Sequence, residues 1–110
     1  PWGHEEVWAL TDYYAGKIIY INEGKRLSLQ YHKIKQETIY VLEGTLELIL
    51  DEQSRKHNRT IILKPGEYYH IEPYTLHRFC ASQGSDVKVI EVSTTQLNDI
   101  VRIEDDYSRK

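Results

Sequence analysis

The sequence predicts an all-β fold, a sandwich or barrel of short strands. Short runs rich in Ile, Val, Leu, Thr and Tyr alternate with turn residues, and no convincing amphipathic helix separates them. The chain of 110 residues has the length of one domain, so a single domain is expected over residues 1–110. A domain of this size buries a modest core, which oligomerisation would supplement.

Each predicted strand combines β-branched, aliphatic or aromatic residues, and most end at a turn signal. The predicted strands are Lys17–Ile21, Arg26–His32, Thr38–Leu42, Thr45–Leu50, Arg59–Leu63, Tyr68–Ile71, His77–Ala81 and Val87–Val92. The turns between them contain Gly24, Gly44, Pro65-Gly66, Pro73 and Gly84.

Three further segments are expected to lie outside these strands. The charged stretch Asp51–Asn58 is typical of an exposed hairpin loop. Thr95–Ile100 fits a short helix capped by a threonine. The residues Glu104–Lys110 are mostly charged and are expected to be solvated.

Composition argues against several classes of partner. The net charge of -3 gives no strong attraction to nucleic acid or to an anionic membrane. No apolar run approaches the ~18 residues of a membrane span. The one cysteine, Cys80, cannot form a disulfide within the chain, lies in an apolar stretch, and is expected to be a buried small hydrophobe. We therefore expect a cytoplasmic protein that binds neither nucleic acid nor membranes.

The strand predicted over Arg26–His32 alternates polar and apolar residues. Because successive side chains of a strand point to opposite faces, the polar residues share one face. That face carries Arg26, Ser28, Gln30 and His32, and the opposite face carries Leu27, Leu29 and Tyr31. If the polar face looks into a barrel, Gln30 and His32 can reach one point; if it faces water, the pattern is structural.

Two residues elsewhere in the chain can complete a metal site. Glu37 begins the next predicted strand, so a hairpin would return its carboxylate to His32, and His77 opens a later strand. With Gln30 these residues supply two imidazole nitrogens, a carboxylate oxygen and an amide oxygen. Such a set suits one divalent ion, with Zn favoured and Mn, Fe, Co or Ni as alternatives.

The same residues carry a family resemblance. Gly24, Gln30, His32, Glu37 and Gly44 match the spacing of the first cupin motif, with Gln30 in place of its first histidine, and 65–77 resembles a relaxed second motif. The resemblance implies a double-stranded β-helix, or jelly-roll barrel, with metal ligands at Gln30, His32, Glu37 and His77.

A narrower resemblance covers nearly the whole chain. Pro1-Trp2-Gly3, the stretch 26–32, Thr75–Arg78 and Asn98–Asp105 are similar to the C-terminal cupin domain of type II phosphomannose isomerases, in which glutamine at the first ligand position is normal. That family often has a histidine and a tryptophan after the glutamate, where this chain has Thr38 and Ile39. These differences from the family lie at the mouth of the expected site. They therefore bear on which substrate the site prefers.

The narrower resemblance implies interconversion of mannose 6-phosphate and fructose 6-phosphate. The substrate phosphate needs a cation, for which we expect Arg26 and Lys35. Arg78 is a further candidate, although alternation points it away from His77 unless a bulge intervenes. His70 is a candidate proton carrier, with Glu67 as a weaker one.

Two alternative functions remain open. The chain fits a non-enzymatic cupin that binds a sugar or metabolite, or another cupin enzyme such as an oxygenase or a sugar epimerase.

A second copy of the chain is an expected partner besides the sugar phosphate. Several strands are apolar on both faces, including 45–50, whereas one barrel has only one interior. We therefore expect a homodimer.

Overall fold

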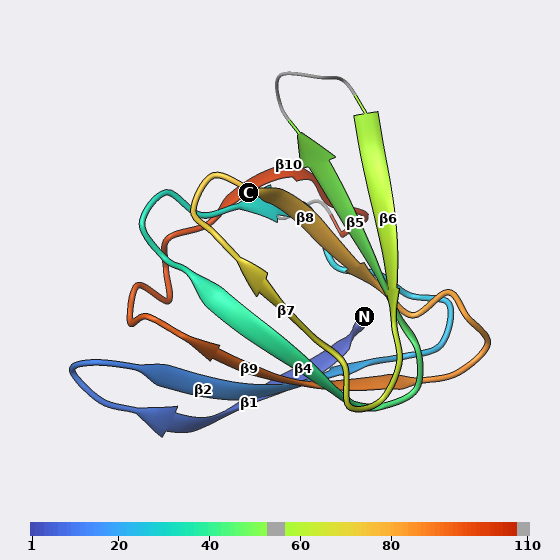
Figure 1. The fold of residues 1–110 in the computed structure, drawn as a ribbon, viewed down its shortest axis with the longest axis horizontal. Helices are drawn as coiled ribbons and strands as arrows, with labels where there is room; N and C mark the ends of the chain where they lie inside the picture. Colours follow the sequence, from blue (N-terminus) through green and yellow to red (C-terminus); the bar gives the residue numbers. More distant parts are fainter. Residues whose placement is uncertain (53–56, 108–110) are drawn as a thin grey trace.

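The computed structural model describes residues 1–52 and 57–107, which form ten strands in two antiparallel sheets (Figure 1). The first sheet has the order β1 (Gly3–Leu10), β2 (Ala15–Ile21), β9 (Val87–Ser93), β4 (Glu37–Glu43), β7 (Tyr68–Ile71). The second has the order β10 (Val101–Glu104), β3 (Leu29–Tyr31), β8 (Leu76–Cys80), β5 (Leu46–Glu52), β6 (His57–Leu63). Apart from the hairpins β1–β2 and β5–β6, consecutive strands alternate between the two sheets, as in a double-stranded β-helix. The predicted all-β fold is confirmed.

The apolar core lies between the two sheets and follows strand alternation. In β4, Ile39 and Val41 point inward and are fully buried, whereas Tyr40 points outward. The second sheet contributes Leu46, Leu48 and Leu50 to the same core. The core therefore fills the space between the sheets through alternate residues of each strand.

Two strands, β1 and β10, were not predicted. The first is largely exposed and rich in charge, and its pairing with β2 shifts register between Val7 and Ala9. The second has four residues and pairs with β3. Neither carries a run of alternating apolar residues, because both are edge strands whose outer faces meet water.

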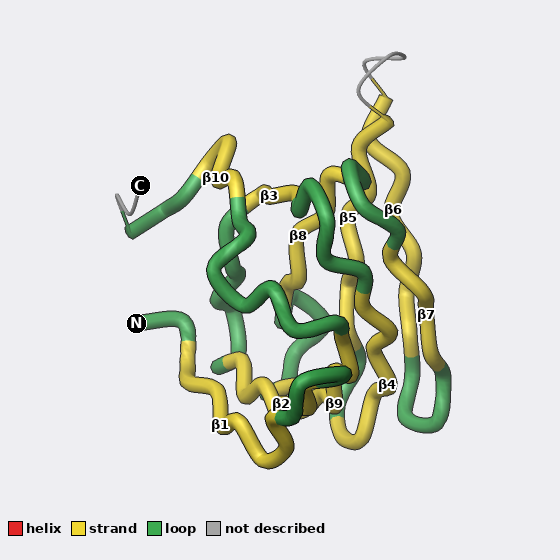
Figure 2. Tube along the Cα trace, turned by 90° about the vertical axis from the view of Figure 1, so that its left-hand side faces the viewer, coloured by secondary structure: helices red, strands yellow, loops and turns green. Residues whose placement is uncertain are grey.

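The predicted helix over Thr95–Ile100 is wrong. These residues form turns in which Leu97 N bonds to Thr95 O and Asp99 N bonds to Gln96 O, spacings too short for an α-helix. Together with Thr94 they connect β9 to β10 and pass beside the segment between β3 and β4 (Figure 2). We call residues 94–100 the strap.

The charged C-terminal segment is not simply solvated. Glu104 belongs to β10, Asp106 pairs with Arg26, and Tyr107 packs against the core. The loop predicted over Asp51–Asn58 is shorter than expected, because β5 extends to Glu52 and β6 begins at His57. The remaining residues of both segments, 53–56 and 108–110, lie outside the described part.

The turn from β4 to β5 requires its glycine. Gly44 has a φ of 76°, a left-handed conformation that side chains with a Cβ disfavour. A Cβ at this position would also lie 2.1 Å from the carbonyl oxygen of Asp86. Gly44 thus permits both the turn and the close approach of the 85–86 backbone.

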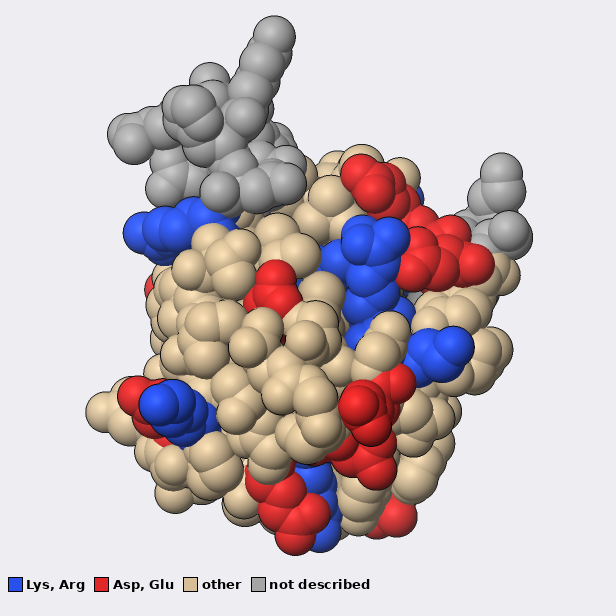
Figure 3. Space-filling view, turned by 90° about the vertical axis from the view of Figure 1, so that its right-hand side faces the viewer, with Lys and Arg blue, Asp and Glu red and all other residues tan. Residues whose placement is uncertain are grey.

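None of the described residues belongs to a helix long and apolar enough to cross a membrane. The face in Figure 3 mixes acidic and basic side chains with a broad uncharged area, and neither sign dominates it.

Candidate metal centre and cavity

Three side chains from different parts of the chain converge inside the barrel. His32 follows β3, Glu37 begins β4 and His77 lies in β8. The Nε2 atom of His32 lies 3.3 Å from Glu37 Oε1, and that of His77 lies 3.0 Å from the same oxygen. All three residues are buried, with exposed fractions of 3%, 2% and 1%. Residues from three separate elements therefore present two nitrogens and an oxygen to one point.

Backbone carbonyls orient both imidazoles. His32 Nδ1 lies 2.5 Å from the carbonyl oxygen of Asp99, and His77 Nδ1 lies 2.8 Å from that of Thr75. Since a carbonyl only accepts hydrogen bonds, each Nδ1 carries the proton and each Nε2 is left as a lone-pair donor. This is the arrangement in which histidine binds a metal ion.

The three converging atoms lack the hydrogen bonds that buried polar atoms normally make. His32 Nε2, Glu37 Oε1 and His77 Nε2 are buried and have no hydrogen-bond partner among the described residues. Buried polar atoms are nearly always satisfied, so three orphans facing one another need an explanation. A divalent cation bound by all three would satisfy them, and two nitrogens with a carboxylate oxygen suit Zn or a similar ion. The residues present therefore fit a metal.

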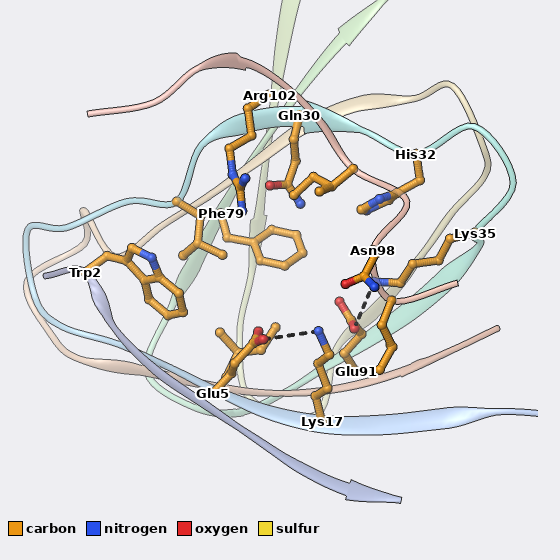
Figure 4. A pocket seen from close by; sticks show the side chains of 14 residues that line it. Trp2, Glu5, Lys17, Gln30, His32, Lys35, Phe79, Glu91, Asn98 and Arg102 are labelled. Carbon is orange, nitrogen blue, oxygen red and sulfur yellow. Dashed lines mark hydrogen bonds and ion pairs between the residues drawn. The ribbon is translucent and has the colours of Figure 1, made fainter. Parts of the chain in front are cut away.

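Gln30 lies beside this cluster. It pairs with His77 across β3 and β8, and its side chain lines the cavity next to His32 (Figure 4). Its Oε1 accepts a hydrogen bond of 2.6 Å from the buried hydroxyl of Ser28. That bond orients the amide and leaves Oε1 its second lone pair.

A cavity of about 360 Å³ opens beside the cluster (Figure 4). Its described lining combines ionisable, amide and apolar side chains. These are Trp2, Glu5, Lys17, Ile19, Leu27, Gln30, His32, Lys35, Phe79, Glu91, Leu97, Asn98, Ile100 and Arg102. The size suits a small metabolite.

Opposite charges alternate along the floor of the cavity. Lys17 Nζ lies 3.2 Å from Glu5 Oε1, and Lys35 Nζ lies 3.5 Å from Glu91 Oε2 and 3.6 Å from Glu37 Oε2. Burial lowers the pKa of Lys35, but the charges of Glu91 and Glu37 outweigh it and raise that pKa above its usual value. Lys35 is therefore a buried cation next to Glu37, one of the three converging residues.

Two carboxyl groups in this row have shifted pKa values in opposite directions. Burial and the neighbouring charge of Glu37 raise the pKa of Glu91 well above its usual range. Burial acts in the same direction on Glu37, but a hydrogen bond from Glu91 opposes it, and the pKa of Glu37 lies well below its usual range. Glu37 is thus the ionised member of the pair, which is the form that metal binding requires.

The sequence did not lead us to predict several cavity residues, although the pattern around two of them indicates a site. Lys17 and Glu91 each occupy an inward strand position next to an apolar inward residue, Ile19 in β2 and Val89 in β9. A charged residue in phase with a buried apolar face indicates a site. Arg102 and Asn98 gave no such signal.

The structure does not bring Arg26 to the cavity. Arg26 forms an isolated bridge with Cys80, and regular β3 starts only at Leu29, so strict alternation fails between them. As a result Leu27 lines the cavity, while the guanidinium of Arg26 bonds to Asp106 at 2.7 Å. The expected placement of Arg26 on the ligand face is therefore corrected.

The other two expected catalytic groups also lie elsewhere. Arg78 points away from His77, as alternation predicted, and its Nε donates to the carbonyl of Leu27 at 2.8 Å. His70 is half exposed on β7, where it contacts Thr38 and Glu72. Of the four candidates, the structure thus places only Lys35 in the cavity.

Cys80 is buried, as predicted. Burial, followed by the charge of Glu47, raises the pKa of its thiol to about 11. The thiolate needed for nucleophilic chemistry is therefore scarce at neutral pH.

Comparison with known proteins agrees with this geometry. Residues 17–93 match the family model described as a cupin domain. The chain is 29% identical over 112 residues to the alginate biosynthesis protein AlgA of Pseudomonas aeruginosa, and the match covers 99% of this chain and 22% of AlgA. The chain thus spans about a fifth of that relative's length, and the match agrees with the narrower resemblance noted for the sequence.

Solved structures show the same fold at low sequence identity. The capsular polysaccharide assembling protein CapF of Staphylococcus aureus has a TM-score of 0.85 at 14% identity, covering 94% of this chain and 32% of CapF. KdgF of Halomonas sp. has a TM-score of 0.76 at 19% identity, covering 90% and 85%. With the match of the domain model over most of its length, the chain belongs to the cupin family.

Proposed function

We propose that this cupin is a metal-dependent isomerase that interconverts mannose 6-phosphate and fructose 6-phosphate. The observation that carries the proposal is the convergence of three orphaned donor atoms, on His32, Glu37 and His77, beside a cavity with buried cations. The match to AlgA, whose name places it in alginate biosynthesis, supports a sugar substrate.

The proposed ligands are Gln30, His32, Glu37 and His77. A bound divalent ion, with Zn as the first choice, supplies a Lewis acid that stabilises developing oxyanion charge. The protein keeps both Nε2 atoms deprotonated through the carbonyls of Asp99 and Thr75. It also keeps Glu37 ionised against the cost of burial.

Cavity residues take over the roles first expected of Arg26, Arg78 and His70. Within the described part of the cavity lining the cations are Lys17, Lys35 and Arg102, and we expect these to bind a sugar phosphate. Aldose–ketose isomerisation also moves a proton between C1 and C2 of the substrate. Among the described lining residues the carboxyl groups are Glu5 and Glu91, so the proton carrier is sought there.

A second function is a cupin that binds a sugar or metabolite without turning it over, and a third is another cupin enzyme. The observation that favours simple binding is the ion pairing of the cavity floor, since Lys17 and Lys35 both already have carboxylate partners. An oxygenase would require a redox metal such as Fe, whereas the isomerase works with redox-silent Zn.

The test measures fructose 6-phosphate formed from mannose 6-phosphate by Zn-loaded protein, with a chelator-treated sample beside it. We expect turnover that chelation removes and Zn restores. Lys35→Ala should reduce kcat/KM by about 100-fold, because a buried cation beside the reacting group is lost. Lys25→Ala, which removes an exposed cation outside the cavity, should retain full activity. Metal-loaded protein that binds the sugar phosphate but forms no product would contradict isomerase activity and favour the binding function.

A further inference from the structure

The strap, residues 94–100, closes one side of the cavity. Leu97, Asn98 and Ile100 line the cavity, so the strap forms part of its wall. Thr94 joins the strap to Gln36 through two hydrogen bonds of 3.1 Å and 3.2 Å. The strap is thus bonded to the segment that leads from the ligand His32 to the ligand Glu37.

Asp99 makes most of the bonds between these two segments. Its Oδ2 accepts from the backbone N–H groups of Ile34 at 2.7 Å and Lys35 at 2.9 Å, and its Oδ1 accepts from that of Lys33 at 3.1 Å. Its own carbonyl accepts from His32 Nδ1 at 2.5 Å. One residue of the strap therefore contacts four consecutive residues, 32–35.

We propose that Asp99 is a positioning residue of the metal centre: its carboxylate holds 33–35 in place and thereby presents its own carbonyl to His32. The carbonyl keeps the proton of His32 on Nδ1, so that Nε2 faces Glu37 and His77 as a lone pair. The carboxylate also fixes the backbone of Lys35, whose side chain enters the cavity. Asp99 acts through these residues and does not itself line the cavity.

The first test uses metal-free protein and does not depend on the proposed function. Nitrogen chemical shifts should show His32 as the Nδ1-protonated tautomer, and the amides of 33–35 should exchange slowly. In Asp99→Ala the protection should be lost and the tautomer should become mixed. Asp99→Asn retains one acceptor oxygen and should fall between the two, which also covers the case in which Asp99→Ala fails to fold.

The second test measures Co²⁺ affinity. Asp99→Ala should weaken Co²⁺ binding by about 10–100-fold, the usual effect of removing a partner that orients a metal ligand, with Asp99→Asn intermediate. Asp86→Ala is the matched control, because Asp86 also accepts a backbone hydrogen bond, from Glu23 at 2.8 Å, but at the opposite end of β9. It should leave Co²⁺ affinity unchanged.

Different results would contradict the role of Asp99 and the proposed metal-dependent function. Unchanged Co²⁺ affinity in Asp99→Ala, with wild-type protein that binds the ion, would overturn the role of Asp99 and leave the metal centre standing. Wild-type protein that binds no Co²⁺ would overturn the metal-dependent function, and the tautomer of His32 in metal-free protein would then decide the role of Asp99.

Discussion

At the scale of single residues, the proposed metal centre depends on which nitrogen of each imidazole carries the proton. His32 and His77 are both buried, and each donates its Nδ1 proton to a backbone carbonyl. Backbone carbonyls are held by the fold, so the two Nε2 lone pairs are oriented before any ion binds. This preorganisation reduces the cost of assembling the site.

Removing either imidazole should abolish metal retention. We expect His32→Ala and His77→Ala each to weaken Zn²⁺ binding by more than about 100-fold, since loss of a ligand exceeds the loss of an orienting partner. Far-ultraviolet circular dichroism should still show a folded β protein. Elemental analysis after dialysis measures the metal content. His70→Ala, which removes a half-exposed histidine outside the cavity, is the control and should keep its metal. A full equivalent of metal in either ligand variant would refute the assignment.

At the scale of elements, the two arginines that lie outside the cavity hold the end of the chain in place. Arg78 donates through Nε to Leu27 and through Nη2 to the carbonyl of Glu104 in β10. Arg26 pairs with Asp106 just beyond β10. These contacts tie β10 to the segment before β3 and to β8. Because β10 carries Arg102 into the cavity, the two arginines support the site indirectly.

The turn between β4 and β5 gives a stability prediction. Gly44→Ala should destabilise the metal-free protein by at least about 1–3 kcal/mol, because a Cβ is strained at this φ and meets the carbonyl of Asp86. Gly24→Ala is the matched control: its φ is 77°, but a Cβ there meets no heavy atom of the described residues within 4 Å. Urea unfolding measures both variants. Equal losses would show that the contact with Asp86 is unimportant.

At the scale of the whole molecule, the outer face of the first sheet exposes large apolar side chains. Trp8 in β1, Tyr40 in β4, Tyr68 in β7 and Val92 in β9 are each more than two-fifths exposed. They come from most strands of one sheet, and exposed apolar patches of this kind mark interaction surfaces. We propose that a second copy of the chain covers this face.

Light scattering tests the proposed homodimer. We expect a particle of twice the 13.0 kDa chain mass at micromolar concentration. Val92→Arg should reduce the mass to that of one chain, because it buries an unpaired charge in the interface. Ile62→Arg is the control, since Ile62 is comparably exposed but lies in β6 of the other sheet. A wild-type particle of 13 kDa would exclude the dimer.

The sequence by itself determined the fold class and most strands of the sheets. Local patterns suffice for this, because alternation and turn residues act over a few neighbours, as in β4 and β9. The ligand candidates His32, Glu37 and His77 were also recognisable, since their spacing matches a cupin motif. The edge strands β1 and β10 escaped detection because they lack a buried alternating face.

Only the tertiary structure decided which polar residues meet in the cavity. The expected placement of Arg26 on the ligand face was corrected because the strand is irregular before Leu29. Arg26 therefore points outward, and Leu27 lines the cavity. Lys17, Glu91 and Arg102 come from three strands whose pairing no local pattern specifies. The bonds of Asp99 to 32–35 join residues more than sixty positions apart. Such contacts arise from the order of strands in the sheets, and that order is a property of the whole chain.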